Sequence, residues 1–284
     1  KHFPDNPGST TFIWPTSKIE AEQWLKEFIK TRLSSYGLRN YKVDNTVAWH
    51  QNSAISPLLN IGLLDPVKVV ELVIEYYAEN KHQLPQVEHF IRQVLGWREF
   101  SRAIYLMGDN KDQLAKLKSD RRLTADWYQG TTGLLPFDSM VGKLNSNGYV
   151  NQSERLYIAG TLMTLCGIST TEVHRWFTEM LIDSTDWALV PNLNLLKQFN
   201  RGPLLDQGVY LATSKFILDH SNFSKGEWCD IWDGLYWNFI EENKTELSKY
   251  AKTRTIVQRM TRLNKDKRRI INYRAQDFLA KFTK

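Results

Sequence analysis

One stretch constrains the fold more than any other: residues 88–105, with the sequence EHFIRQVLGWREFSRAIY. Apolar side chains recur along it mostly three or four residues apart, which is the pattern of an amphipathic helix with one buried face. We therefore expect a helix over residues 88–105 that lies near the centre of the fold. Its apolar positions are Phe90, Ile91, Val94, Leu95, Phe100, Ile104 and Tyr105.

Helix signals continue in both directions from this stretch. Ser17 with Glu20, and Ser169 with Glu172, have the spacing of a capping box, in which two side chains satisfy free backbone amides at a helix start. No stretch alternates apolar and polar residues convincingly enough for a strand, so the predicted class is all-α. Further helices are expected over residues 136–146, 153–166, 169–182, 210–219, 232–249, 251–262 and 265–282.

Segments rich in proline and glycine separate these helices. Residues 1–15 predict an extended lead-in, and residues 16–284 are expected to form a single helical domain. Residues 187–208 contain two prolines and two glycines and predict a long, structured loop. A loop of this length within a compact domain is usually functional.

Composition excludes several classes of protein. The chain of 284 residues has two cysteines, Cys166 and Cys229, which are too few for a disulfide framework, so a reducing intracellular compartment is expected. No run of eighteen apolar residues indicates a membrane span, and a soluble protein is therefore expected. The histidines are scattered and show no metal-ligand spacing. A net charge of +6 permits an anionic partner without requiring one.

Basic residues accumulate toward the C-terminal end of the sequence. Residues 244–284 contain thirteen Lys or Arg and three Asp or Glu. Such a segment is commonly a solvated helical face. The alternative is a surface that faces phosphate groups, where Lys and Arg release counterions on binding nucleic acid. DNA is therefore a candidate partner of the 244–284 segment.

Several strings, found in one order, resemble the photolyase/cryptochrome family. The string RQVLGWREF at residues 92–100 is similar to the signature of that family's flavin-binding helical domain, and nearest to the bacterial (6-4) photolyase branch that carries an iron–sulfur cluster. The resemblance implies a helical bundle around FAD, without the family's N-terminal α/β antenna domain, which a separate partner chain could supply. Further similar strings lie at residues 14–16, 23–25, 53–64, 174–177, 190–193 and 233–239.

The resemblance also implies which residues contact FAD. One group would meet its pyrophosphate, a second would surround the flavin, and a third would come from the loop after residue 190. These groups are Ser53, Ser56 and Asn60; Gln93, Trp97 and Arg98; and Asn192, Gln198 and Phe199.

Other positions depart from the chemistry of the family. A four-iron cluster needs four thiolates, and Pro136 stands at the first expected cysteine, so no iron–sulfur cluster is expected. Asn151 and Gln152 stand at the positions of a His-His pair, and neither amide can supply a proton near neutral pH. Leu189 stands at the acidic position expected beside the flavin. The three positions are therefore interpreted as degenerate catalytic positions.

The branch's route for electrons into the flavin is also interrupted. Trp176 is retained, but Phe177 replaces a tyrosine and Tyr128 replaces a tryptophan. Phenylalanine is much harder to oxidise than either residue. Electron transfer through Trp176 is therefore expected to be impaired.

Three hypotheses about function follow. The first is an FAD-binding helical module that has lost (6-4) DNA repair chemistry and is a pseudoenzyme. The second is a flavin-free structural or interaction subunit, which keeps the fold because its helical core still packs. The third is an active DNA photolyase, a lyase, with an altered site.

Overall fold

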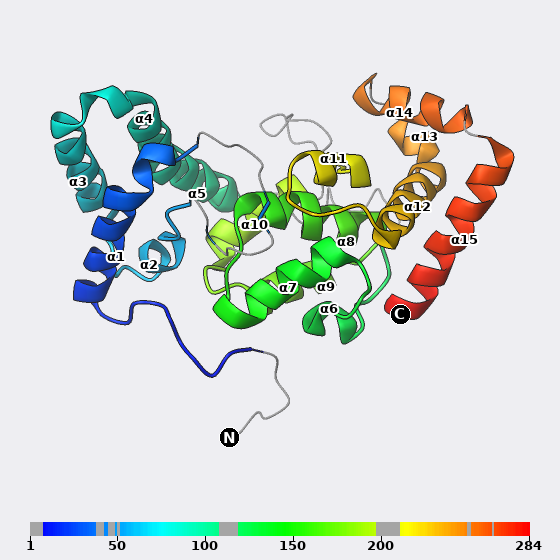
Figure 1. Ribbon diagram of the computed structural model, residues 1–284, viewed down its shortest axis with the longest axis horizontal. Coiled ribbons are helices and arrows are strands. Elements are labelled where there is room, and N and C mark those ends of the chain that lie inside the picture. The colour runs from blue at the N-terminus through cyan, green and yellow to red at the C-terminus, as the bar shows by residue number, and fades with distance from the viewer. Residues whose placement is uncertain are drawn as a thin grey trace.

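The fold is a set of helices joined by turns. The computed structural model describes residues 8–37, 43–44, 49, 52–107, 119–196, 211–248, 251–262 and 264–284. Within these ranges the backbone forms no strand, only three isolated β-bridges, and the all-α class is confirmed. None of the helices in these ranges is long and apolar enough to cross a bilayer. Figure 1 shows α1–α5 gathered at one end of the molecule and α12–α15 at the other.

The first group of helices encloses its own hydrophobic core, which includes Leu25, Phe28, Val73 and Phe90. Ser17 caps the first helix and its partner Glu20 completes the expected capping box. The elements are α1 (Lys18–Thr31), a 3₁₀ turn (Leu33–Ser35), α2 (Ser56–Asn60), α3 (Pro66–Glu79), a 3₁₀ turn (Lys81–Gln83), α4 (Leu84–Arg92), a π-helical turn (Gln93–Trp97) and α5 (Arg98–Leu106).

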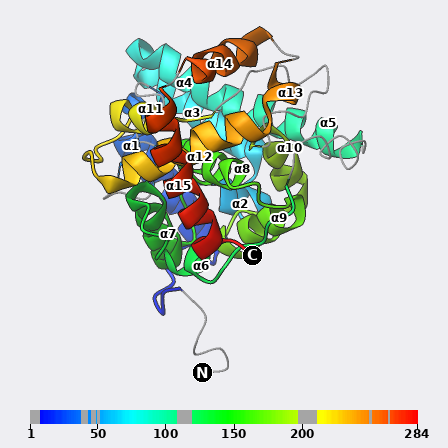
Figure 2. The same cartoon turned by 90° about the vertical axis from the view of Figure 1, so that its right-hand side faces the viewer.

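The second group of helices surrounds a larger core, in which Trp127, Phe137, Trp176 and Trp232 are almost fully buried. Figure 2 shows α12 and α15 lying against each other on its outer side. The elements are α6 (Asp126–Gln129), α7 (Leu135–Asn147), a π-helical segment (Glu154–Gly160), α8 (Thr161–Leu165), α9 (Thr170–Met180), α10 (Asp186–Leu196), α11 (Ser214–Asp219), α12 (Glu227–Glu242), α13 (Lys244–Leu247), α14 (Ala251–Thr261) and α15 (Lys265–Phe282).

The helix predicted over residues 88–105 differs from the expectation in three respects. It is α4 and α5 joined by the π-helical turn, and it lies in the first group at the border with the second, not at the centre (Figure 1). Leu95 and Tyr105 are 44% and 40% exposed. Each directly follows a buried residue, Val94 or Ile104, and successive side chains of a helix point about 100° apart.

Two further predictions about helices were wrong. Residues 186–196 form α10, although 187–208 was expected to be a loop. Pro191 removes one backbone hydrogen bond within α10, and packing of the apolar helix on α5 compensates for that loss. Ser169 does cap α9, but Glu172 does not return the bond. The carboxylate of Glu172 instead accepts from the backbone N–H of Leu123 at 3.2 Å. Residues 197–208 lie outside the described ranges.

The contact between α12 and α15 depends on Gly234. A Cβ atom at this position would lie 2.9 Å from the carbonyl oxygen of Ile271. We expect Gly234→Ala to lower the free energy of unfolding by about 1–3 kcal/mol, because backbone atoms must move apart to admit the methyl group. Gly142→Ala in α7 is the matched control, since nothing lies within 4 Å of its Cβ position.

We expect the control substitution to raise the free energy of unfolding by about 0.5–1 kcal/mol, the usual preference of a helix interior for alanine over glycine. Urea denaturation followed by tryptophan fluorescence measures both variants. Equal effects of the two substitutions would show that the α12–α15 contact is not close at Gly234.

Candidate functional site

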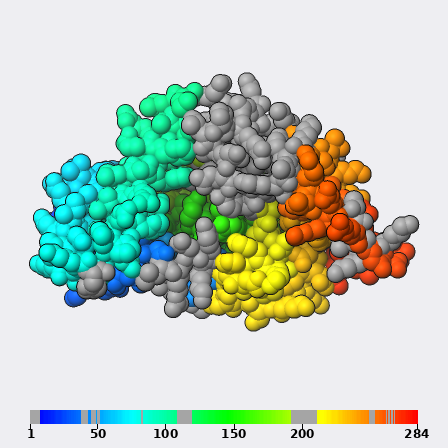
Figure 3. All heavy atoms as spheres, turned by 90° about the horizontal axis from the view of Figure 1, so that it is seen from above, coloured from blue at the N-terminus to red at the C-terminus, as the bar shows by residue number. Residues whose placement is uncertain are grey.

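A cavity of about 520 Å³ lies between the two groups of helices. One wall is formed by α2, the π-helical turn and α5, and the other by residues 149–155, the end of α9 and the start of α10. Its volume is typical of sites that bind small molecules and cofactors. Seen from above, the surface is hollowed between the α3–α5 side and the residues around α11 (Figure 3).

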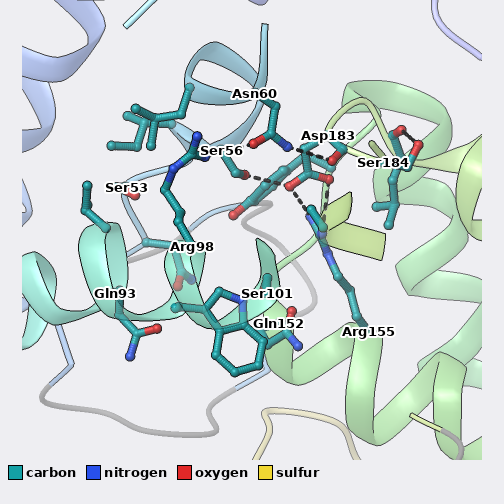
Figure 4. A pocket seen from close by; sticks show the side chains of 18 of the residues that line it. Ser53, Ser56, Asn60, Gln93, Arg98, Ser101, Gln152, Arg155, Asp183 and Ser184 are labelled. Carbon is teal, nitrogen blue, oxygen red and sulfur yellow. Dashed lines mark hydrogen bonds and ion pairs between the residues drawn. The ribbon is translucent and has the colours of Figure 1, made fainter. Parts of the chain in front are cut away.

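Asp183 connects the two walls of the cavity. One terminal nitrogen of Arg155 donates to the buried carboxylate of Asp183 at 3.0 Å, and the other lies 3.0 Å from the second carboxylate oxygen, so the two side chains form an ion pair. The hydroxyl of Ser56 donates to the same carboxylate at 2.6 Å, and the side-chain amide of Asn60 donates to the carbonyl oxygen of Asp183 at 2.9 Å. Figure 4 shows these contacts converging on Asp183 from α2 and from Arg155.

Arg155 is held as a fixed cation. Burial acts to lower its pKa, but the Asp183 carboxylate and Tyr149 outweigh burial, so the pKa is raised above its ordinary value. The guanidinium lies 5.0 Å from the centre of the Tyr149 ring, and its Nε donates to the carbonyl oxygen of Val150 at 2.9 Å. Burial is also the main reason that the pKa of Tyr149 rises to about 12, so this phenol is neutral at physiological pH.

A second cation, Arg98, lies on the opposite wall. Its Nη1 donates to the side-chain oxygen of Asn60 at 3.0 Å, and its guanidinium lies 4.9 Å from the centre of the Trp187 ring. Burial lowers the pKa of Arg98, and Glu99 offsets part of this effect. An arginine side chain nevertheless stays protonated at physiological pH. Planar guanidinium groups suit the recognition of phosphate oxygens, so the cavity can receive an anionic group.

Aromatic and aliphatic side chains also contribute to the lining. Trp97 and Trp187 are partly exposed, and Phe177 and Leu189 are buried beside the cavity. Large ring systems of this kind bury a planar ligand well. The cavity therefore combines cationic, hydrogen-bonding and aromatic surfaces.

Most of the residues singled out from the sequence come together here. They lie on both walls, and they come from elements separated by up to 136 positions in the chain. The ones that line the cavity are Ser53, Ser56, Asn60, Gln93, Trp97, Arg98, Gln152 and Leu189.

Asn151 and Trp176 do not line the cavity. Asn151 is buried, and its side-chain oxygen accepts from the backbone N–H of Glu154 at 3.0 Å, as at a helix start. Trp176 is fully buried, and its Nε1 donates to the carbonyl oxygen of Trp127 at 3.1 Å. Both side chains therefore have structural partners away from the cavity.

Three of the expected contact residues cannot be located with respect to the cavity. Gln198 and Phe199 lie outside the described residues. Asn192 belongs to α10, but its side chain lies outside them as well.

Sequence reasoning missed several residues that shape the site: Tyr149, Arg155, Asp183 and Trp187. Arg155 and Asp183 are 28 positions apart, so no local pattern links them. The available signal was weak: each charged residue borders apolar residues on one side only, Leu156–Ile158 after Arg155 and Met180–Ile182 before Asp183, and a buried charge requires a partner. Nothing in their spacing identified the partner.

Comparisons with known proteins agree with this picture. The model of a protein family described as "FAD binding domain of DNA photolyase" matches residues 82–194, which include both guanidinium groups of the cavity. A (6-4) photolyase of Agrobacterium fabrum is 29% identical over 98% of this chain. A deoxyribodipyrimidine photo-lyase of Vibrio cholerae is 24% identical over 65% of this chain and 40% of its own length. The chain spans 57% of the length of the Agrobacterium relative.

The fold agrees with a solved structure as well. The crystal structure of a Synechocystis cryptochrome superposes on 94% of this chain and 53% of its own, with a TM-score of 0.59 and 17% identity. At that identity the superposition shows a shared helical fold and no more. The family match over residues 82–194, the (6-4) photolyase that is similar along 98% of this chain, and the shared helical fold agree in relating the chain to the photolyase/cryptochrome family.

Proposed function

We propose that residues 16–284 form one FAD-binding helical module and that FAD occupies the cavity between the two groups of helices. The observation that carries this proposal is the pair of guanidinium groups, Arg98 and Arg155, on opposite walls of a cavity lined by aromatic rings. The matched family range, residues 82–194, contains both arginines.

The chemistry of FAD fits these residues. Its diphosphate is anionic and suits Arg98, with Ser53, Ser56 and Asn60 of the same wall as hydrogen-bonding partners. Its fused ring is planar and suits Trp97. When bound, FAD would supply the light-driven redox chemistry that this chain's own side chains lack.

We infer further that the module has lost (6-4) repair. Gln152 lines the cavity where the resembled branch has a histidine, and Leu189 brings a buried aliphatic side chain where the branch has an acid. The two cysteines of the sequence are both buried and cannot supply four thiolates to a cluster. No histidine lines the cavity among the described residues, which supports a role other than catalysis of this repair.

A flavin-free structural or interaction subunit is the second candidate. The observation that favours it is that charged and polar groups within each wall are already paired: Arg155 with Asp183 on one wall, and Arg98 with Asn60 on the other. Part of this network would need to rearrange around a diphosphate. FAD binding separates the two candidates, because only the first requires it.

The C-terminal basic segment is proposed as a surface for an anionic partner such as DNA. Arg268 pairs with Glu241 and Arg274 with Asp230, which neutralises two of its charges. Arg254 of α14, Arg262 just after it and Arg269 of α15 are exposed, which leaves cationic side chains for contact with phosphates. Binding through them would weaken as salt concentration rises.

Trp97 provides the test of the proposed flavin position. We expect Trp97→Ala to weaken FAD binding by about 2 kcal/mol, or about thirtyfold in Kd, because a large aromatic contact is lost. Fluorescence titration with FAD measures the constant. Tyr105→Ala is the matched control: Tyr105 is an exposed aromatic residue of the next helix and does not line the cavity. Unchanged affinity in the Trp97 variant would remove Trp97 from the site.

A further inference from the structure

An aromatic cluster lies behind the cavity and joins four separate parts of the chain. Trp14 comes from the extended segment 8–16, Trp24 from α1, and Tyr149 from the turn after α7. The ring of Trp14 stacks on that of Trp24 at 5.4 Å between centres and lies 5.6 Å from that of Tyr149. Trp49 contacts both tryptophans edge-on. Trp14 is the buried centre of the cluster, at 6% exposure.

Through Tyr149, the cluster supports the wall that holds the buried ion pair. Nε1 of Trp14 donates to the carbonyl oxygen of Asn147 at 2.7 Å, two residues before Tyr149. The same turn supplies the carbonyl of Val150, which fixes Arg155, and the carbonyl of Gly148, which receives the backbone N–H of Ile182 beside Asp183. Trp14 therefore holds the turn on which both partners of the ion pair depend.

The cluster also supports the opposite wall. Nε1 of Trp24 donates to the carbonyl oxygen of Ser53, a residue that lines the cavity, at 3.3 Å. Ala54, which packs in the same cluster, has a φ of +52° and is the only residue other than glycine with positive φ among those described. Such a conformation costs about 1 kcal/mol or more and persists only where the surroundings impose it. Here the surroundings are those of the cluster, in which Ala54 is buried beside Trp14 and Tyr149.

We propose that Trp14 is a positioning residue of the cavity, so that docking of segment 8–16 and binding of FAD favour each other. The inference rests on the proposed function, since FAD is the ligand whose affinity it concerns. Coupling between two binding events is reciprocal: the factor by which undocking weakens FAD equals the factor by which FAD opposes undocking. A single cause should therefore produce two results: weaker FAD binding when Trp14 is replaced, and slower undocking of segment 8–16 when FAD is bound.

The first measurement compares the Kd for FAD of folded Trp14→Ala, Trp14→Phe and Trp228→Ala proteins. Trp228 is the matched control, because it is also buried and its Nε1 also donates to a backbone carbonyl, but it lies in α12 and away from the cavity. We expect Trp14→Ala to raise the Kd by about tenfold, a typical coupling factor. Trp14→Phe should retain most of the affinity, and Trp228→Ala should leave the Kd unchanged despite its loss of stability.

The second measurement uses the unaltered chain and so does not depend on a variant that folds. Chymotrypsin cleavage after Phe12, which is exposed on segment 8–16, reports undocking of the segment when reclosing is faster than cleavage. Saturating FAD should slow this cleavage by the factor found for Trp14→Ala. Cleavage after Tyr273, exposed on α15, should not change.

The outcomes distinguish the inference from the function on which it rests. FAD binding by the unaltered chain, together with equal affinity in Trp14→Ala and unchanged cleavage after Phe12, would overturn the positioning role alone. An unaltered chain that binds no FAD would overturn both.

Discussion

Replacing Asp183 with alanine is expected to lower the free energy of unfolding by about 3–5 kcal/mol, the usual cost of leaving one partner of a buried ion pair without the other. The substitution strands the guanidinium of Arg155, whose side chain is 16% exposed. It also removes the acceptor of the Ser56 hydroxyl on the opposite wall. FAD binding should fall with stability, because both walls lose a shared contact.

A double substitution separates the stranded charge from the general loss of packing. Asp183→Ala with Arg155→Met replaces the cation by an apolar side chain, and such replacements of buried pairs are often well tolerated. We expect the double variant to be more stable than Asp183→Ala alone. Urea denaturation of the two single variants and the double variant completes a thermodynamic cycle. A loss below about 1 kcal/mol in Asp183→Ala would show that the pair is solvated, as surface pairs are.

The second large effect concerns catalysis: the chain is expected to repair (6-4) photoproducts at least about 10²-fold more slowly than an intact relative, because general acid–base catalysis contributes about 10²–10⁴-fold. Gln152 faces the cavity but cannot give up a proton near neutral pH. Asn151 is engaged with Glu154 and is not at the cavity. The expected defect therefore lies in the step at the lesion and not only in the reduction of the flavin.

The assay supplies chemically reduced flavin, an oligonucleotide with one lesion, and blue light. This design bypasses the electron route through Trp176, so that only the step at the lesion is compared. The Agrobacterium (6-4) photolyase serves as the positive control. Gln152→His returns a histidine to the cavity and is compared in the same assay, because residue 152 is exposed and tolerates a new side chain. Repair by the unaltered chain at a rate near that of the control would contradict the loss of function.

Local features of this fold could be predicted from the sequence. The capping box of Ser17 and Glu20 depends on a spacing of three residues and is present as expected. The apolar face of α4 is also local, and Phe90 and Val94 are buried as their spacing predicts. Each of these features follows from neighbours within one or two helical turns.

Features that depend on distant residues could not be predicted in the same way. Pro191 and the nearby glycines indicated a loop, yet packing against α5 makes residues 186–196 helical. The contact of Trp14 with Tyr149 spans 135 positions, and the pair of Arg155 with Asp183 spans 28. Periodicity does not show which buried charge or ring meets which. The eight sequence-chosen residues at the cavity came instead from family resemblance, which carries information about distant contacts.

Binding of FAD by this chain is tested most directly by an absorption spectrum. The purified chain is incubated with FAD, free cofactor is removed by gel filtration, and the spectrum is recorded beside a circular dichroism measurement that confirms folding. We expect flavin bands near equimolar amounts with the protein, and their loss in the Asp183→Ala variant. A folded, unaltered chain that retains no flavin absorbance would contradict the claim and favour a structural subunit without cofactor.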